Sequence, residues 1–278
     1  MPRDRARRPR PAARYRRTPS EAAPAESPPS SVPPPVVPPR RVVGLDLAGS
    51  PNRRTGFCLL TDGRVTRTRV LGDDSEIVSV VGTADPKVVV IDAPLSLPRG
   101  RRSLDLPGPP HFRACDLELR RRGIRFFPLT LGPMRILTAR GIVIKHALEA
   151  RGLTVLEGYP GGTQDIAGWP RKSKGADRLQ RALTRFGFTG DVADRTLTHD
   201  ELDAICCAWA GDLLLRGEAI LIGDPSEGTM VLPGPSVLRP RPPRPRGSRG
   251  GRADGRPRRG KGPVPSPAST SSDRPPPT

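Results

Sequence analysis

The sequence is short of apolar and aromatic residues, which make up 35% and 4% of its 278 residues. No apolar run approaches the roughly 18 residues that a membrane-spanning helix needs, so we expect no membrane span. The charged N-terminus is not followed by an apolar segment, which argues against a secretory signal peptide. A phosphate-binding GxxxxGK[ST] motif is also missing, which excludes a P-loop enzyme.

Cysteine and histidine are scarce as well, with four and three residues. The cysteines lack CxxC spacing and the histidines lie far apart along the chain. The sequence therefore predicts neither a zinc site nor a disulfide framework. We expect buried, reduced thiols and a cytoplasmic location.

Proline, glycine and arginine are abundant instead, and they concentrate at the two ends. The formal net charge of +19 divides into +7 for residues 1–41, +3 for residues 42–233 and +9 for residues 234–278. The terminal segments have too little apolar surface to offset the entropy of ordering, so we predict disordered basic tails around one folded domain. Such tails suit salt-sensitive contacts with nucleic acid, although the arginine bias of a GC-rich genome produces the same composition.

Hydrophobic periodicity divides the central segment into strands and helices. Strands are predicted at 41–49, 55–63, 64–72, 87–98 and 153–160, with a closing hairpin at 219–233. Helices are predicted at 73–85, 113–122, 134–152, 175–188 and 198–217. The turn Asp62-Gly63 favours a hairpin, so the first three strands are expected to form an antiparallel meander. The predicted fold class is α/β, a mixed sheet of this meander plus parallel strands with flanking helices.

An acidic residue ends each of three buried strands: Asp46, Asp92 and Glu157. Ligands gather at the carboxyl ends of the strands in an open α/β sheet. The first and fourth strands are expected to run parallel, which places Asp46 beside Asp92. A single aspartate at a strand end also fits an ordinary turn or cap role, so the prediction depends on the combination.

Three further polar residues share one face of the last long helix: His199, Asp200 and Asp203. Asp203 lies among apolar residues, where an unpaired acid is costly. Asp200 also fits a first-turn helix acid, and His199 fits either proton transfer or an ordinary helix start. Converging carboxylates need a compensating cation, and two magnesium-like ions there would suit phosphodiester hydrolysis.

The order of elements and the positions of the acids resemble the RNase H-like superfamily. GLDLAGS at 44–50 and HDELDAICCAWA at 199–210 resemble the first and last motifs of RuvC-type resolvases. IDAPLSLP at 91–98, RACDLELRRRGIRFFP at 113–128 and LEGYP at 156–160 are similar to internal motifs of "domain of unknown function 429", a predicted nuclease family of this fold.

The resemblance implies an RNase H-like fold and a site that holds Mg²⁺ or Mn²⁺, with two ions expected. It assigns the metal to four aspartates: Asp46, Asp92, Asp200 and Asp203. Glu157 would belong to the same catalytic site, with His199 assisting proton transfer. The resolvases carry Glu on the fourth strand, whereas Asp92 here is one methylene shorter.

We therefore predict a metal-dependent nuclease that acts on DNA or RNA, and two alternatives stay open. Actin-like phosphotransferases and ATPases share the fold, and residues 44–56 loosely resemble their first phosphate loop. Residues 158–165 are the single candidate for the second loop. A non-catalytic nucleic-acid-binding protein would instead act through the basic tails.

Several arginines after the fourth strand suit phosphate contacts: Arg113, Arg120–Arg122 and Arg125, followed by Arg135 and Arg140 in the next long helix. For Arg120–Arg122 a solvated helix face is the preferred interpretation. Aromatic residues near them are few in the sequence, so no stacking platform for single-stranded nucleic acid is predicted.

Overall fold

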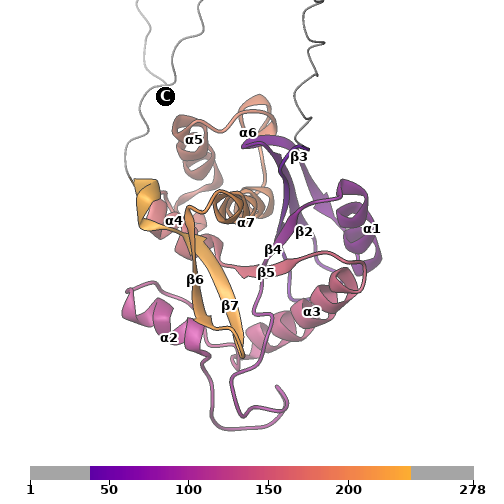
Figure 1. The fold of residues 1–278 in the computed structure, drawn as a ribbon, viewed down its shortest axis with the longest axis vertical. Helices are drawn as coiled ribbons and strands as arrows, with labels where there is room; N and C mark the ends of the chain where they lie inside the picture. The colour runs from indigo at the N-terminus through magenta and orange to yellow at the C-terminus, as the bar shows by residue number, and fades with distance from the viewer. Residues whose placement is uncertain (1–37, 239–278) are drawn as a thin grey trace, which may run out of the picture.

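The structure is a computed structural model that describes residues 38–238. These residues form a seven-stranded sheet with helices on both faces (Figure 1). The strands are β1 (Arg41–Asp46), β2 (Thr55–Thr61), β3 (Arg64–Leu71), β4 (Val88–Asp92), β5 (Val155–Gly158), β6 (Ala219–Asp224) and β7 (Gly228–Pro233). Residues 1–37 and 239–278, which make up most of the two predicted tails, lie outside the described part.

The helices connect the strands in the order that the sequence predicts. They are α1 (Asp74–Ala84), α2 (Ala114–Arg121), α3 (Gly132–Glu149), α4 (Pro160–Ala167), α5 (Ala176–Phe186), α6 (Asp191–Asp194) and α7 (His199–Leu215), with short 3-10 helices at Lys172–Lys174 and Pro235–Leu238. The sequence does not predict α4 and α6. Among helices in residues 38–238, none combines the length and apolarity that crossing a membrane requires.

The strand order across the sheet is β3-β2-β1-β4-β5-β7-β6. The first three strands form an antiparallel meander, and β4, β5 and β7 extend it with parallel pairings that begin at β1. The hairpin β6–β7 closes the far edge. The predicted α/β mixed sheet with an antiparallel meander is therefore confirmed.

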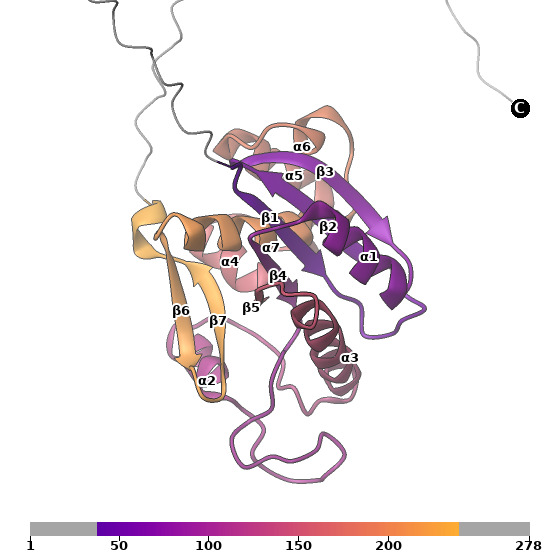
Figure 2. The same cartoon turned by 45° about the vertical axis from the view of Figure 1, so that its right-hand side comes forward.

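Two hydrophobic cores cover the two faces of the sheet. On one face α7 packs across the central strands, where Gly211 lies against the side chains of Val42 and Val90. On the other face α1 and α3 cover the alternate residues of the same strands (Figure 2). Because successive strand residues point to opposite faces, the continuous apolar runs of β1 and β4 supply both cores.

Glycine in β1 allows α7 to lie unusually close to the sheet. A Cβ atom on Gly44 would lie 2.0 Å from the carbonyl oxygen of Ala204 and 2.4 Å from the amide nitrogen of Ala208. A Cβ on Gly56, which pairs with Asp46 across the β1–β2 ladder, would lie 2.0 Å from the Asp200 carbonyl oxygen. These contacts bring the first turns of α7 to the end of β1.

Replacing Gly44 with alanine is expected to lower the free energy of unfolding by about 1–3 kcal/mol, because the added methyl group meets helix backbone that has no room to move. Chemical denaturation followed by circular dichroism measures the change. Gly82→Ala in α1 is the matched control, since its Cβ would meet nothing within 4 Å. That variant should be neutral or gain about 0.5–1 kcal/mol. If both substitutions changed the free energy of unfolding equally, the close approach of α7 to β1 would be contradicted.

Candidate functional site

Asp46 and Asp92 end two neighbouring parallel strands, β1 and β4, and are directly paired in the register of the sheet. The predicted side-by-side placement of these two acids is thus confirmed. Asp46 is 9% exposed and Asp92 is partly buried. Both line a cavity of about 380 Å³, which we call the carboxylate cavity.

Asp203 reaches the carboxylate cavity from α7, which lies across the strands. Its side chain is 2% exposed, and its Oδ1 accepts a hydrogen bond from Gln164 Nε2 at 2.7 Å. Lys172, from the 3-10 helix that follows α4, completes the group. Its Nζ lies 2.7 Å from Asp203 Oδ2 and 3.7 Å from Asp46 Oδ2. The structure therefore gathers three predicted aspartates around one lysine that sequence reasoning missed.

The three aspartates act on one another electrostatically. Burial raises the pKa of Asp46 to about 7; the charge of Lys172 opposes this shift, and the charges of Asp203 and Asp200 reinforce it. Burial, followed by the charges of Asp46 and Asp203, also raises the pKa of Asp92 well above its usual value. Burial disfavours the charged form of Lys172, but Asp46 and Asp203 outweigh it and raise the pKa of this ammonium. One lysine does not balance three ionised aspartates, so without a further cation Asp46 and Asp92 keep their protons to a higher pH than usual.

Asp200 and His199 lie at the start of α7. Asp200 is partly buried, and its backbone packs against Gly56, beside Asp46. Its charge reaches Asp46, whose pKa it helps to raise. His199 is exposed at the first residue of the helix, and neither His199 nor Asp200 is among the residues that line the carboxylate cavity. The structure therefore brings Asp200 near the aspartate group but outside the cavity lining, and it leaves His199 exposed.

Glu157 lines the same cavity but is already paired. Its Oε1 accepts a hydrogen bond from Arg113 Nη2 at 2.7 Å. Its Oε2 accepts from Arg113 Nη1 and from the backbone amide of Leu95. Arg113, 1% exposed, also pairs with Asp116 at 3.0 Å. Glu157 thus joins a buried ion cluster that anchors the chain three residues after Asp92.

Two of the arginines predicted to contact phosphate are buried, and for them the prediction is wrong. Arg113 is enclosed by its two carboxylate partners. Arg140, 6% exposed, pairs with Asp74 at 2.6 Å and donates to the carbonyl oxygens of Ala48 and Ser50. Both guanidinium groups hold loops next to the strand ends, since their hydrogen-bonding groups are used within the chain.

The donor set of the carboxylate cavity fits a hard divalent cation. Aspartate oxygens are the ligands that Mg²⁺ and Mn²⁺ prefer, and the Lys172 ammonium already lies between two of the carboxylates. Within residues 38–238, no three His, Cys, Asp or Glu side chains are arranged to hold a metal ion. Because the Lys172 ammonium group contacts both Asp46 and Asp203, a metal ion that binds these two carboxylates must displace it.

Residues 158–165, the candidate for a second phosphate loop, form a different structure. Pro160–Ala167 is helix α4, and both of its glycines are buried. A Cβ on Gly161 would meet the Arg171 guanidinium, and one on Gly162 would lie 2.9 Å from the Tyr159 ring. The glycines here serve close packing, so no open phosphate-binding loop exists at this position.

The fold and the cavity together define an α/β protein with a seven-stranded mixed sheet and a group of aspartates where the carboxyl ends of β1 and β4 meet α7. Residues 44–227 match the family described as Protein of unknown function (DUF429), and the chain belongs to this family. No curated protein matches the sequence.

Two solved structures of RuvC from Thermus thermophilus are similar to the chain. RuvC in complex with a Holliday junction substrate has 13% sequence identity and a TM-score of 0.39, and the match covers 64% of this chain and 96% of RuvC. The other RuvC structure has 12% identity and a TM-score of 0.36 over the same shares of the two chains.

Proposed function

We propose that the protein is a metal-dependent nuclease that hydrolyses phosphodiester bonds of DNA or RNA at the carboxylate cavity. The observation that carries the proposal is the meeting of Asp46, Asp92 and Asp203 in one buried cavity from β1, β4 and α7. Buried carboxylates with raised pKa values next to one another mark functional sites more often than structural ones. Mg²⁺ or Mn²⁺ is the cofactor, with two ions expected.

Asp46, Asp92 and Asp203 would hold the metal, with Asp200 beside them. When bound, such ions activate a water molecule and stabilise the leaving oxygen in phosphodiester hydrolysis. Gln164 fixes the orientation of Asp203, so that its second oxygen is directed to Lys172. The ammonium group of Lys172, once released from Asp203, is placed to pair with a phosphate oxygen of the substrate.

Glu157 acts in this proposal as a positioning residue, because Arg113 and the Leu95 amide use both of its oxygens. His199 remains a predicted proton-transfer group at the exposed start of α7. Nucleic-acid binding by the basic tails, cytoplasmic location and reducing surroundings also stay predictions. All four cysteines are free and buried, as the sequence predicts.

The test is hydrolysis by the purified full chain. Labelled single strands, duplexes, RNA–DNA hybrids and four-way junctions are incubated with Mg²⁺ or Mn²⁺, and with EDTA. We expect cleavage that depends on the metal. Nucleotide binding by calorimetry without any cleavage would favour a phosphotransferase or ATPase instead. Nucleic-acid binding that disappears with the tails, again without cleavage, would favour a binding protein.

A Lys172→Met chain is expected to gain more thermal stability from added Mn²⁺ than the wild type gains. The ammonium group and the metal compete for the same oxygens of Asp203 and Asp46, so removing the ammonium group strengthens metal binding. Melting temperature with and without Mn²⁺ measures the difference. Lys174→Met, an exposed residue on the same 3-10 helix, is the control. If Mn²⁺ raised the melting temperatures of the two variants equally, competition between Lys172 and the metal would be contradicted.

A further inference from the structure

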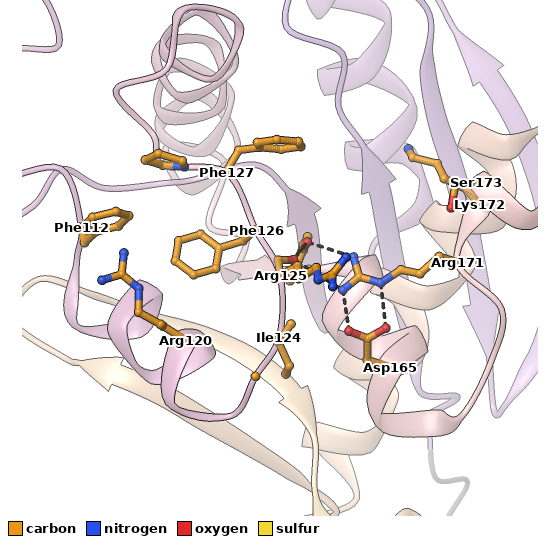
Figure 3. Close-up of a pocket in the computed structure, with 13 residues that line it drawn as sticks. Phe112, Arg120, Ile124, Arg125, Phe126, Phe127, Asp165, Arg171, Lys172 and Ser173 are labelled. Carbon is orange, nitrogen blue, oxygen red and sulfur yellow. Dashed lines mark hydrogen bonds and ion pairs between the residues drawn. The ribbon is translucent and has the colours of Figure 1, made fainter.

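A second, larger cavity of about 1030 Å³, shown in Figure 3, shares lining residues with the carboxylate cavity. Five residues line both: Phe126, Phe127, Tyr159, Arg171 and Lys172. The two cavities are therefore neighbours, and Lys172, which lines both, contacts Asp46 and Asp203. A molecule that occupies the larger cavity lies next to the proposed metal site.

Aromatic rings are concentrated in the larger cavity. The sequence has six phenylalanines, and three of them, Phe112, Phe126 and Phe127, line it. Phe112 and Phe126 meet edge to face with ring centroids 6.0 Å apart, while the Phe127 side chain is 69% exposed. Phe127 takes part in no aromatic pair among residues 38–238, so its exposed ring is available to a ligand.

The aromatic segment is held in place from the opposite wall. The backbone carbonyl oxygen of Arg125 accepts hydrogen bonds from the Tyr159 hydroxyl and from Arg171 Nη2. Arg171 is itself fixed by Asp165, whose Oδ1 accepts from Arg171 Nε at 2.7 Å (Figure 3). These contacts fix the backbone next to Phe126 and Phe127, which lowers the entropic cost of binding a ligand there.

Two guanidinium groups lie next to the rings without a carboxylate partner. Arg120 stacks over the Phe112 ring at 4.2 Å from the ring centroid. Neither Arg120 nor Arg125 forms an ion pair with another residue of the described range 38–238. The adjacent Arg121 and Arg122, by contrast, both pair with Glu118. Positive charge beside exposed aromatic rings complements phosphate beside a base.

We propose that the larger cavity binds an unpaired strand of nucleic acid, with bases stacked on Phe127 and its neighbours and phosphates paired with Arg120 and Arg125. The assignment rests on the proposed nuclease function, and it names the substrate class of that site as unpaired nucleotides. A duplex buries its base faces within its own stack, so it offers nothing to these rings. The sequence predicts no stacking platform because it does not show that the fold brings Phe112 to Phe126, 14 residues away.

The test measures binding without catalysis. Fluorescence anisotropy in EDTA compares a labelled 20-nucleotide single strand with a duplex of the same sequence, using the full chain. Phe127→Ala is expected to weaken single-strand binding roughly ten-fold, with little effect on the duplex. Val143→Ala, 63% exposed on α3, is the matched apolar control and should bind like the wild type. Arg120→Gln should weaken single-strand binding, while Arg185→Gln on the exposed face of α5 should not.

Photo-crosslinking locates the strand independently of affinity. A 5-iodouracil strand is expected to cross-link to the peptide that contains Phe126 and Phe127. Cross-links confined to the tails, or equal affinities of wild type and Phe127→Ala, would overturn the proposal whether or not the chain is a nuclease. A mapped contact at Phe127 without hydrolysis under any metal condition would uphold the stacking site and refute the nuclease function.

Discussion

An Asp46→Asn chain is expected to lose metal-dependent hydrolysis by about a hundred-fold to a thousand-fold while remaining folded. The substitution keeps the shape of the side chain and removes one of the charges that would hold the metal. In the folded protein the Asp46 carboxylate is nearly buried and faces Asp92 and Asp203. Removing a buried charge that repels two neighbours does not weaken the fold, so stability without metal should hold or increase.

Two measurements separate this expectation from a structural role for Asp46. Hydrolysis rates with Mn²⁺ give the loss of activity, and thermal melting in EDTA gives the stability of the metal-free chain. Calorimetry with Mn²⁺ should show weakened metal binding in the variant. Asp177→Asn is the control, because this exposed acid pairs with Arg181 and does not line the carboxylate cavity. Wild-type hydrolysis by Asp46→Asn would refute the assignment of the cavity as the active site.

The parts of the site that could be predicted from sequence are those that local patterns encode. An apolar run that stops at an acid predicts both a buried strand and the position of its last side chain, as for Asp46 and Asp92. The last long helix follows from the Thr198–Glu201 capping box and its apolar composition. The first helix begins where predicted, with Asp73 as the cap that accepts from the Glu76 amide.

The parts that the sequence did not predict depend on contacts between distant segments. Arg113 meets Glu157 across 44 residues, and nothing local to either residue indicates the pair. Lys172 lies in a polar loop whose composition shows no link to the strand ends. Helix α4 has a proline and two glycines in its first turn, which indicates a loop; packing against Tyr159 and α7 stabilises it instead.

Arg113→Met is expected to lower the free energy of unfolding by about 3–5 kcal/mol. The guanidinium group is 1% exposed and satisfies two carboxylates, Glu157 and Asp116, that are each 4% exposed. Although burial disfavours its charge, these partners raise the pKa of Arg113 well above its usual value. Methionine fills a similar volume but leaves both carboxylates buried without a cation, which is the costly part of breaking a buried ion pair.

Urea denaturation followed by circular dichroism measures this loss, with Arg122→Met as the matched control. Arg122 pairs with Glu118 at the exposed end of α2, so its removal should cost less than about 1 kcal/mol. Adding Glu157→Gln to Arg113→Met should recover part of the lost stability, because one of the uncompensated charges disappears. Equal costs for the two arginine variants would show that the buried cluster does not stabilise the fold. Glu157 would then lose its proposed role, since Arg113 could no longer be what fixes it beside Leu95.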